Sequence, residues 1–247
     1  MWFVIYSPGL GGNHLLNVIN TDPAMEADID FIMSRYQPDV TSAFAIDDAV
    51  NHFHHSPGSN HTYKTFENYQ SFTRADVRNL FEKGNKAACA HLAEYVNVYY
   101  DQDTSAQKHL IIDLPKIKRS DNLAWQRWMS YSLKMMFPGN RDENEDEDSF
   151  NFNDVAWLQH EYLWYSPDIL NRLIPQNDMF RIPSEIVFSR YGDTVCEWFF
   201  DNTDLKPNPE LVRTMQSKFF QECSQQVQDR LARYREAKSA NFNRYDD

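Results

Sequence analysis

A strand-like run that leads at once into a glycine cluster and then a helical pattern most constrains how this chain folds. Residues 2–6 (WFVIY) are all apolar or aromatic and end at Ser7-Pro8-Gly9, as expected of a strand buried in a parallel sheet. From His14, apolar residues recur at helical spacing until Thr21-Asp22-Pro23, which supplies a stop. Three of the seven glycines lie between the two patterns. The sequence therefore predicts a strand, a glycine loop and a helix in one short unit.

Strand-like and helical patterns alternate along the rest of the chain and predict an α/β fold. A strand is expected at 109–115, and a short element followed by a strand within 169–188. Segment 86–100 could be a strand, a helix or a strand leading into a helix, because periodicity cannot decide for so dense an apolar run. Helices are expected at 25–36, 73–84, 154–165 and 208–238, and from Ser120, the expected N-cap, to 137, with a loop at 51–62.

This organisation favours a three-layer α/β/α fold with a central parallel sheet and helices on both faces. No repeat or glycine-rich linker divides the chain, so residues 1–247 are expected to form a single domain with a flexible acidic loop near 139–149. That loop contains 141–148 (RDENEDED), where like charges repel and apolar residues are missing. A cation-binding loop is the alternative interpretation, although the central glycine of an EF-hand is absent.

Composition excludes several classes of protein. A net charge of −12 argues against general nucleic-acid binding, whose affinity comes mainly from basic patches. No window approaches the roughly 18 consecutive apolar residues of a membrane span, and the apolar start is too short for a signal peptide. The three cysteines, Cys89, Cys196 and Cys223, are far apart and indicate no disulfide framework. We therefore expect a cytoplasmic protein that binds neither membrane nor nucleic acid.

The glycine loop is the main candidate for a binding site. Backbone amides at the start of a helix suit a phosphate or sulfate group, and glycine lets such an anion approach closely. The phosphate loop that ends in Gly-Lys-Ser/Thr would need a lysine and a hydroxyl residue where Asn13 and His14 follow Gly12. A dinucleotide fingerprint would need glycine or alanine at His14. Neither familiar pattern matches.

A third pattern matches better. Residues 8–15 (PGLGGNHL) resemble the P-K-S-G-T-T-W-L loop of the PAPS-dependent sulfotransferases, with Pro8, Gly11 and Leu15 in register. The resemblance implies that this loop binds the 5′-phosphosulfate of PAPS. Gly9 stands where that family has its lysine, and Gly12-Asn13 replace two hydroxyl residues. The contacts that the resemblance implies come from Gly9, Leu10, Gly11, Gly12, Asn13 and His14.

Two later stretches extend the resemblance. The segment CAHLAEY is similar to the family's T-H-L-P, which places His91 on the general base. A pKa of about 6.5 suits this role, but a lone histidine among apolar neighbours is more often a structural residue. The segment after the 109–115 strand is similar to the family's R-N-P region, with Asp113 at the arginine position and Asp121 at the serine position. Lys116, Lys118, Arg119 and Ser120 could bind the 3′-phosphate instead, or begin a solvent-facing helix.

The resemblance covers most of the chain in order. Near the C-terminus, Pro183-Ser184-Glu185 would occupy a turn before the last helix, and the divergent form is similar to sulfotransferase-like proteins of bacteriophages. The implied function is sulfuryl transfer from PAPS to a hydroxyl or amine of a small-molecule or glycan acceptor, without a metal. An inactive relative that serves in binding or assembly is the alternative. A phosphoryl transferase is less consistent because the lysine-hydroxyl pair is missing.

Four histidines form a second cluster, within 52–61. Imidazoles this close can bind a transition metal, yet no cysteine or carboxylate pattern completes a zinc site. We expect a polar loop here. In a sulfotransferase-like fold, one of these histidines could act as the base in place of His91. They are His52, His54, His55 and His61.

Overall fold

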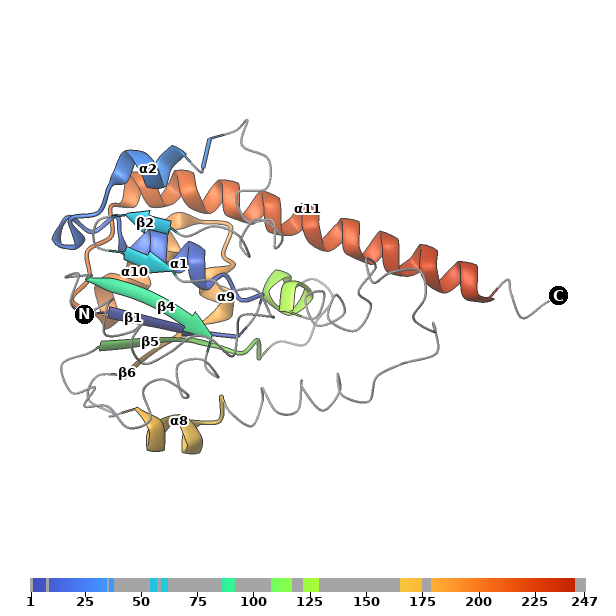
Figure 1. The fold of residues 1–247 in the computed structure, drawn as a ribbon, viewed down its shortest axis with the longest axis horizontal. Coiled ribbons are helices and arrows are strands. Elements are labelled where there is room, and N and C mark those ends of the chain that lie inside the picture. The colour runs from blue at the N-terminus through green and yellow to red at the C-terminus, as the bar shows by residue number, and fades with distance from the viewer. Residues whose placement is uncertain are drawn as a thin grey trace.

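The structure is a computed structural model that describes residues 2–7, 9–34, 36–37, 54–56, 59–61, 86–91, 108–116, 122–128, 165–174 and 179–242. It is a mixed α/β fold (Figure 1). The strands are β1 (Trp2–Tyr6), β2 (His54–Ser56), β3 (Ser59–His61), β4 (Ala87–His91), β5 (Lys108–Asp113) and β6 (Met179–Pro183). The helices are α1 (Gly12–Ile19), η1 (Pro23–Met25), α2 (Ile29–Ser34), α8 (Pro167–Leu173), α9 (Ser184–Val187), α10 (Gly192–Asn202) and α11 (Pro209–Phe242), and residues 123–128 are also helical.

The strands form one sheet in the order β2-β3-β4-β1-β5-β6. β1 lies in the middle and is parallel to both of its neighbours, β4 and β5. β3 and β6 extend the parallel arrangement on the two sides, and β2 is antiparallel to β3. All five residues of β1 are buried, which is why its sequence is continuously apolar. The predicted strand at 2–6 and parallel sheet are confirmed.

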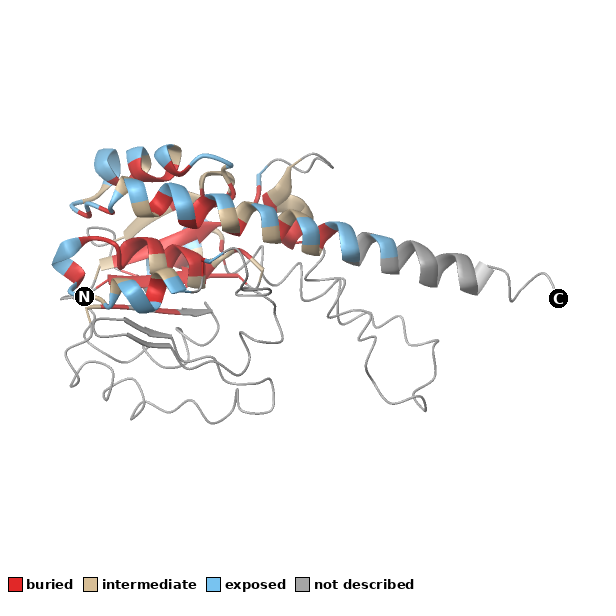
Figure 2. Ribbon diagram, turned by 90° about the horizontal axis from the view of Figure 1, so that it is seen from above, coloured by how far each residue is buried: buried red, intermediate tan, exposed pale blue. Residues whose placement is uncertain are grey.

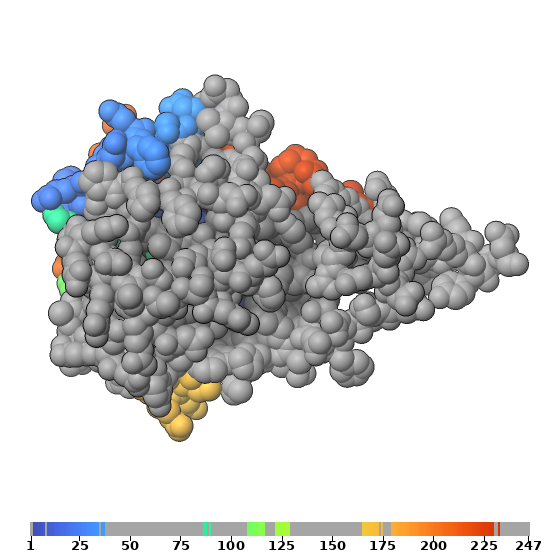
Figure 3. Space-filling model, viewed as in Figure 1, coloured from blue at the N-terminus to red at the C-terminus, as the bar shows by residue number. Residues whose placement is uncertain are grey.

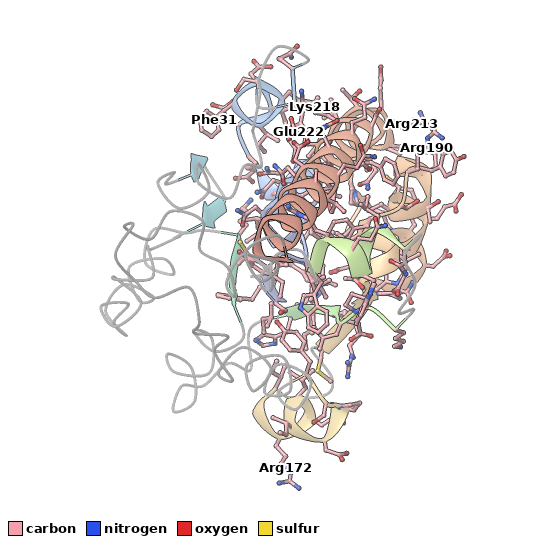
Figure 4. The ribbon with its side chains drawn as sticks, turned by 90° about the vertical axis from the view of Figure 1, so that its right-hand side faces the viewer. Phe31, Arg172, Arg190, Arg213, Lys218 and Glu222 are labelled. Carbon is pink, nitrogen blue, oxygen red and sulfur yellow. The ribbon has the colours of Figure 1, made fainter. Side chains whose placement is uncertain are left out.

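Helices pack against the sheet with their apolar sides. α1 contacts β1, β4 and α11, and α10 packs along α11. Figure 4 shows α1, α10 and α11 on the same side of the sheet, and Figure 2 shows that buried and exposed residues alternate along α11. Figure 3 shows α2 in blue and α8 in yellow at opposite ends of the surface in that view. The complete three-layer arrangement, with helices on both faces, and the single domain at 1–247 stay predictions.

α11 is a helix of 34 residues, or about 51 Å at 1.5 Å per residue. Its buried apolar residues recur every three or four positions, as in a helix with one face on a core. This confirms the predicted C-terminal helix. Figure 1 shows that α11 runs in the direction of the parallel strands and continues past their carboxyl ends. The buried apolar residues are Val212, Met215, Phe219, Cys223 and Val227.

Two sequence-based assignments are wrong. The segment at 51–62 was expected to be a loop, but it contains β2 and β3, which pair as His54↔His61. Three-residue polar strands lack the alternation that signals a strand, and their stability comes from pairing with neighbours. The second concerns the cap of the 123–128 helix. Asn122 Oδ1 accepts from the backbone N–H of Trp125 (3.1 Å), which is the N-cap pattern expected for Ser120.

Several predictions lie outside the described residues. These are the helix at 73–84 and the acidic loop near 139–149. The helix expected at 154–165 overlaps the described part only at Tyr165, and the one expected to 137 is described over 123–128. Within the described part of the chain, no helix is both long enough and apolar enough to cross a membrane.

Candidate functional site

The glycine loop lies at the carboxyl end of the central strand. From β1 the chain goes to β3 and β4 on one side of the sheet, and later to β5 on the other side. Such a reversal of strand order is a topological switch point, where open α/β sheets bind ligands outside the carboxyl ends of their strands. The register pairs Tyr6 at the end of β1 with His91 at the end of β4. The sequence alone does not indicate that the ends of these two strands are neighbours.

The loop begins with a tight turn that requires a glycine. The Leu10 N–H donates to the Ser7 carbonyl oxygen at 3.1 Å. Gly9, at the third position of this turn, has a φ of 86°, a conformation that costs other residues energy. Leu10 is completely buried and anchors the turn in the core. At the start of the turn, Ser7 Oγ accepts from Trp128 Nε1 (3.1 Å), so the 123–128 helix is fixed to the loop.

Packing also requires the next two glycines. Gly11 is the N-cap of α1, with φ 75° and ψ 27°, and a Cβ there would lie 2.8 Å from Phe219 Cζ. A Cβ on Gly12 would lie 2.1 Å from Tyr6 Cδ1, which is deep inside the ring's van der Waals surface. Close packing therefore explains why each of these positions is a glycine, in addition to any role in ligand binding.

The first turn of α1 lacks the usual caps. Within the described residues, no side chain makes a capping hydrogen bond at its N-cap Gly11, and no acidic residue lies in its first turn. The Leu15 N–H donates to the Gly11 carbonyl oxygen (3.0 Å), so the amides of Gly12 and Asn13 come before the first intrahelical bond. These N–H groups stand at the positive end of the helix dipole. The loop therefore presents donors suited to an anion.

Asn13 adds an oriented side chain to this turn. Its Oδ1 accepts from the Tyr6 hydroxyl (3.1 Å) and from Cys89 Sγ (3.7 Å). Because both donors lie on the oxygen side of the carboxamide, the Nδ2 amino group is directed away from Tyr6 and Cys89. Asn13 is partly exposed, so this amino group is a further donor at the start of α1.

His14 lies in the same turn, but its imidazole belongs to the core. The residue is 1% exposed, and Nε2 lies 2.8 Å from Gln216 Oε1. Gln216 Nε2 donates to the carbonyl oxygens of Val187 (2.9 Å) and Ser189 (2.6 Å), so Oε1 is the acceptor and His14 Nε2 carries the proton. Nδ1 then accepts from the Tyr36 hydroxyl (3.1 Å).

These contacts define His14 as a neutral structural residue. Burial lowers the pKa of His14 from 6.5 to about 4, and the hydrogen bond with Gln216 opposes this shift only in part. The imidazole of His14 is therefore not available for the anion contact that the sequence predicted. The sequence alone gave no signal for the partner Gln216, which lies 202 positions away.

A buried ion pair lies at the end of β5. Asp113 is 6% exposed and accepts from Arg181 Nε at 2.6 Å and Nη2 at 2.5 Å. Lys116 Nζ lies 3.8 Å from the other carboxylate oxygen. The resemblance placed Asp113 where an arginine was expected. In the structure, Arg181 of β6 lies beside Asp113, and the negative charge of Asp113 balances the positive charge of this arginine.

The other predicted site residues are only partly located. His91 ends β4, so its backbone lies beside that of Tyr6, but its side chain is outside the described residues. Lys118, Arg119 and Ser120 also lie outside them. The structure thus brings together the glycine loop, Tyr6 and the backbone of His91. It leaves the predicted 3′-phosphate cluster untested.

Within the described residues, no group of three or more histidine, cysteine or acidic side chains could hold a metal ion. Cys89, Cys196 and Cys223 are buried cysteines that are not part of a disulfide bond. Burial, followed by the charge of Asp193, raises the pKa of Cys196 to about 11, so this thiol is unsuited to act as a nucleophile. No protein-family model, curated protein or solved structure matches the chain.

Proposed function

We propose that the glycine loop binds the 5′-phosphosulfate of PAPS and that the protein transfers a sulfuryl group to a hydroxyl or amine of a small-molecule or glycan acceptor. One observation carries this proposal: the N-terminus of α1 has no side-chain cap, follows two glycines of positive φ and lies at the carboxyl end of the central strand. An anion is the ligand that such a site favours.

The residues in the loop are suited to hold an anionic group. The amides of Gly12 and Asn13 would donate to it, together with the oriented Asn13 side chain. PAPS would supply the sulfuryl group: its bond between sulfur and the 5′-phosphate oxygen would break as the acceptor bonds to sulfur, and PAP would leave. His91 is the proposed base because its strand ends beside Tyr6, and an acceptor hydroxyl must lose its proton as it forms the new bond to sulfur. Lys118, Arg119 and Ser120 are the proposed 3′-phosphate contacts.

The strand order supports this proposal over a dinucleotide-binding fold. In that fold the second parallel strand along the chain pairs directly with the first. Here β1 pairs with β4 and β5, and β3 lies one strand further out. The proposed architecture is the three-layer α/β/α fold of the sulfotransferases, with helices on both faces of the sheet.

A second candidate is a sulfotransferase-like binding or assembly protein without catalytic activity. Gly9 provides no cation in the loop. At the end of β5, Arg181 is already paired with Asp113. Both observations favour this candidate, because sulfuryl transfer needs positive charge where negative charge develops. The two candidates share nucleotide binding and differ only in turnover.

Calorimetric titration with PAP and with ATP tests the proposal, and Asn13→Asp is the sharpest variant. The new carboxylate can still accept from Tyr6 and Cys89, and an acidic residue in the first turn favours the helix. Its charge would repel the ligand, however. We expect PAP binding to weaken at least about tenfold, or 1.4 kcal/mol, with no loss in thermal stability.

Asn208→Asp is the matched control. Asn208 Oδ1 accepts from the N–H groups of Glu210 and Leu211 at the start of α11, so the variant adds the same charge to another helix N-terminus. PAP affinity should not change there. If the folded wild-type protein binds no PAP, the proposal is wrong. PAP binding without transfer from PAPS to any acceptor would favour the non-catalytic candidate.

A further inference from the structure

We propose that α11 is a clamp that holds the glycine loop in its binding conformation, so that separation of α11 from α1 releases the loop. In this clamp, residues of α11 stabilise the conformation of a loop that lies far from them in the sequence. Its existence depends only on contacts within the protein. Its effect on ligand affinity rests on the proposed function.

Few interactions within the glycine loop stabilise its conformation. Gly9 and Gly11 both have positive φ, and glycines lose more conformational entropy on ordering than any other residue. α1 has no side-chain cap. The turn contributes one backbone hydrogen bond, from Leu10 to Ser7. Other elements must therefore fix the loop.

Phe219 of α11 provides one of the fixing contacts. Its ring stacks on the His14 imidazole, with centroids 3.9 Å apart and planes within 5° of parallel. The same ring lies against Gly11, where Val187 Cγ1 of α9 also approaches. Phe219 is 2% exposed. One aromatic side chain thus covers both the N-cap and the first turn of α1.

Gln216, one turn earlier in α11, provides the polar part of the clamp. It is completely buried. Its amino group donates to two carbonyl oxygens at the end of α9, and its oxygen accepts from His14. One side chain therefore joins α1, α9 and α11. Because a buried polar group costs free energy when it loses its partner, these bonds should form and break together.

Hydrogen exchange on the full-length protein, read by mass spectrometry, distinguishes a clamp from ordinary core packing. Phe219→Leu should shrink the contact with Gly11 and His14, and thus allow the loop to open locally. We expect the hydrogen-bonded amides of Leu10 and Leu15 to exchange about tenfold faster, while those of β5 keep their wild-type rate.

Two phenylalanine variants are matched controls. Phe220→Leu changes the neighbouring, half-buried residue of α11, and Phe199→Leu changes a fully buried residue of α10. Neither should alter exchange at Leu10 and Leu15 relative to β5. The clamp is refuted if Phe219→Leu leaves the loop unchanged. It is also refuted if Phe219→Leu accelerates the loop and β5 equally, because that pattern is global unfolding.

Gln216→Met provides a second route if Phe219→Leu does not fold. It keeps the length of the side chain and removes all three hydrogen bonds, and Gln225→Met on the exposed face of α11 is its control. The same selective loop exchange is expected. PAP affinity should fall in step with loop opening. If the wild-type protein binds no PAP, the proposed function fails, but the exchange pattern still decides for or against the clamp.

Discussion

The two ends of α1 are stabilised in opposite ways. At the C-terminal end, side-chain oxygens accept backbone bonds: Thr21 Oγ1 from Asn208 N (2.9 Å), and Asp22 from Ala24 N (2.9 Å) and Lys206 N (2.6 Å). At the N-terminal end, no side chain of the described part of the chain caps the helix. Aromatic rings and the core hold the glycine loop instead. The polar groups at one end thus serve the fold, while the amides at the other end are those that we propose to bind an anion.

The largest expected effect is at the N-terminal end. Gly12→Ala would place a methyl group 2.1 to 2.3 Å from three atoms of the Tyr6 ring. Overpacking of this severity should lower the free energy of unfolding by about 3 kcal/mol, measured by denaturant titration. Tyr6→Leu should restore part of this loss in the double variant. A stable Gly12→Ala protein would show that ring packing does not require this glycine.

A second large effect is expected from pH. Between pH 6.5 and 4, the unfolded chain binds a proton at His14 that the folded protein excludes, so stability should fall as pH falls through this window. The loss attributable to His14 is about 3 kcal/mol at pH 4. Other groups titrate as well, so the measurement is the difference in pH dependence between wild type and His14→Gln. Parallel curves would contradict the neutral, buried imidazole.

The smallest effect has the opposite sign and lies at the C-terminal end of α1. Asn20 is completely buried, and neither Nδ2 nor Oδ1 has a hydrogen-bond partner among the residues that the structure describes. Asn20→Leu has similar size and leaves no buried polar atom unpaired, so it should raise the free energy of unfolding by about 1 kcal/mol. Thermal denaturation measures this change. A destabilised variant would mean that Asn20 contributes to the polar network at this end.

Much of the fold could be predicted where a pattern is local. The apolar run of β1, the proline that follows β5 and the 3–4 spacing of α11 each appear within one stretch of sequence. β2 and β3 could not be predicted, because three polar residues carry no periodic signal. Their strand character depends on pairing with β4.

The glycine loop of the candidate site could be predicted from the sequence, but the residues that surround it could not. Its glycines indicated close approach of an anion, whereas the structure shows that Gly11 and Gly12 also accommodate Phe219 and Tyr6. The arginine that meets Asp113 comes from a strand 68 positions away. No sequence pattern indicates such pairs, because they depend on how strands and helices are arranged in the folded protein.

The bond between His14 and Gln216 also has a consequence during synthesis of the chain. It joins residues 202 positions apart, which a ribosome separates by roughly 10 to 40 s at ordinary elongation rates. The first strand and helix therefore leave the ribosome long before α11 exists to pack on them. Until then the glycine loop lacks its contacts with α11. In a nascent chain that ends before α11, the loop should therefore not adopt its native conformation.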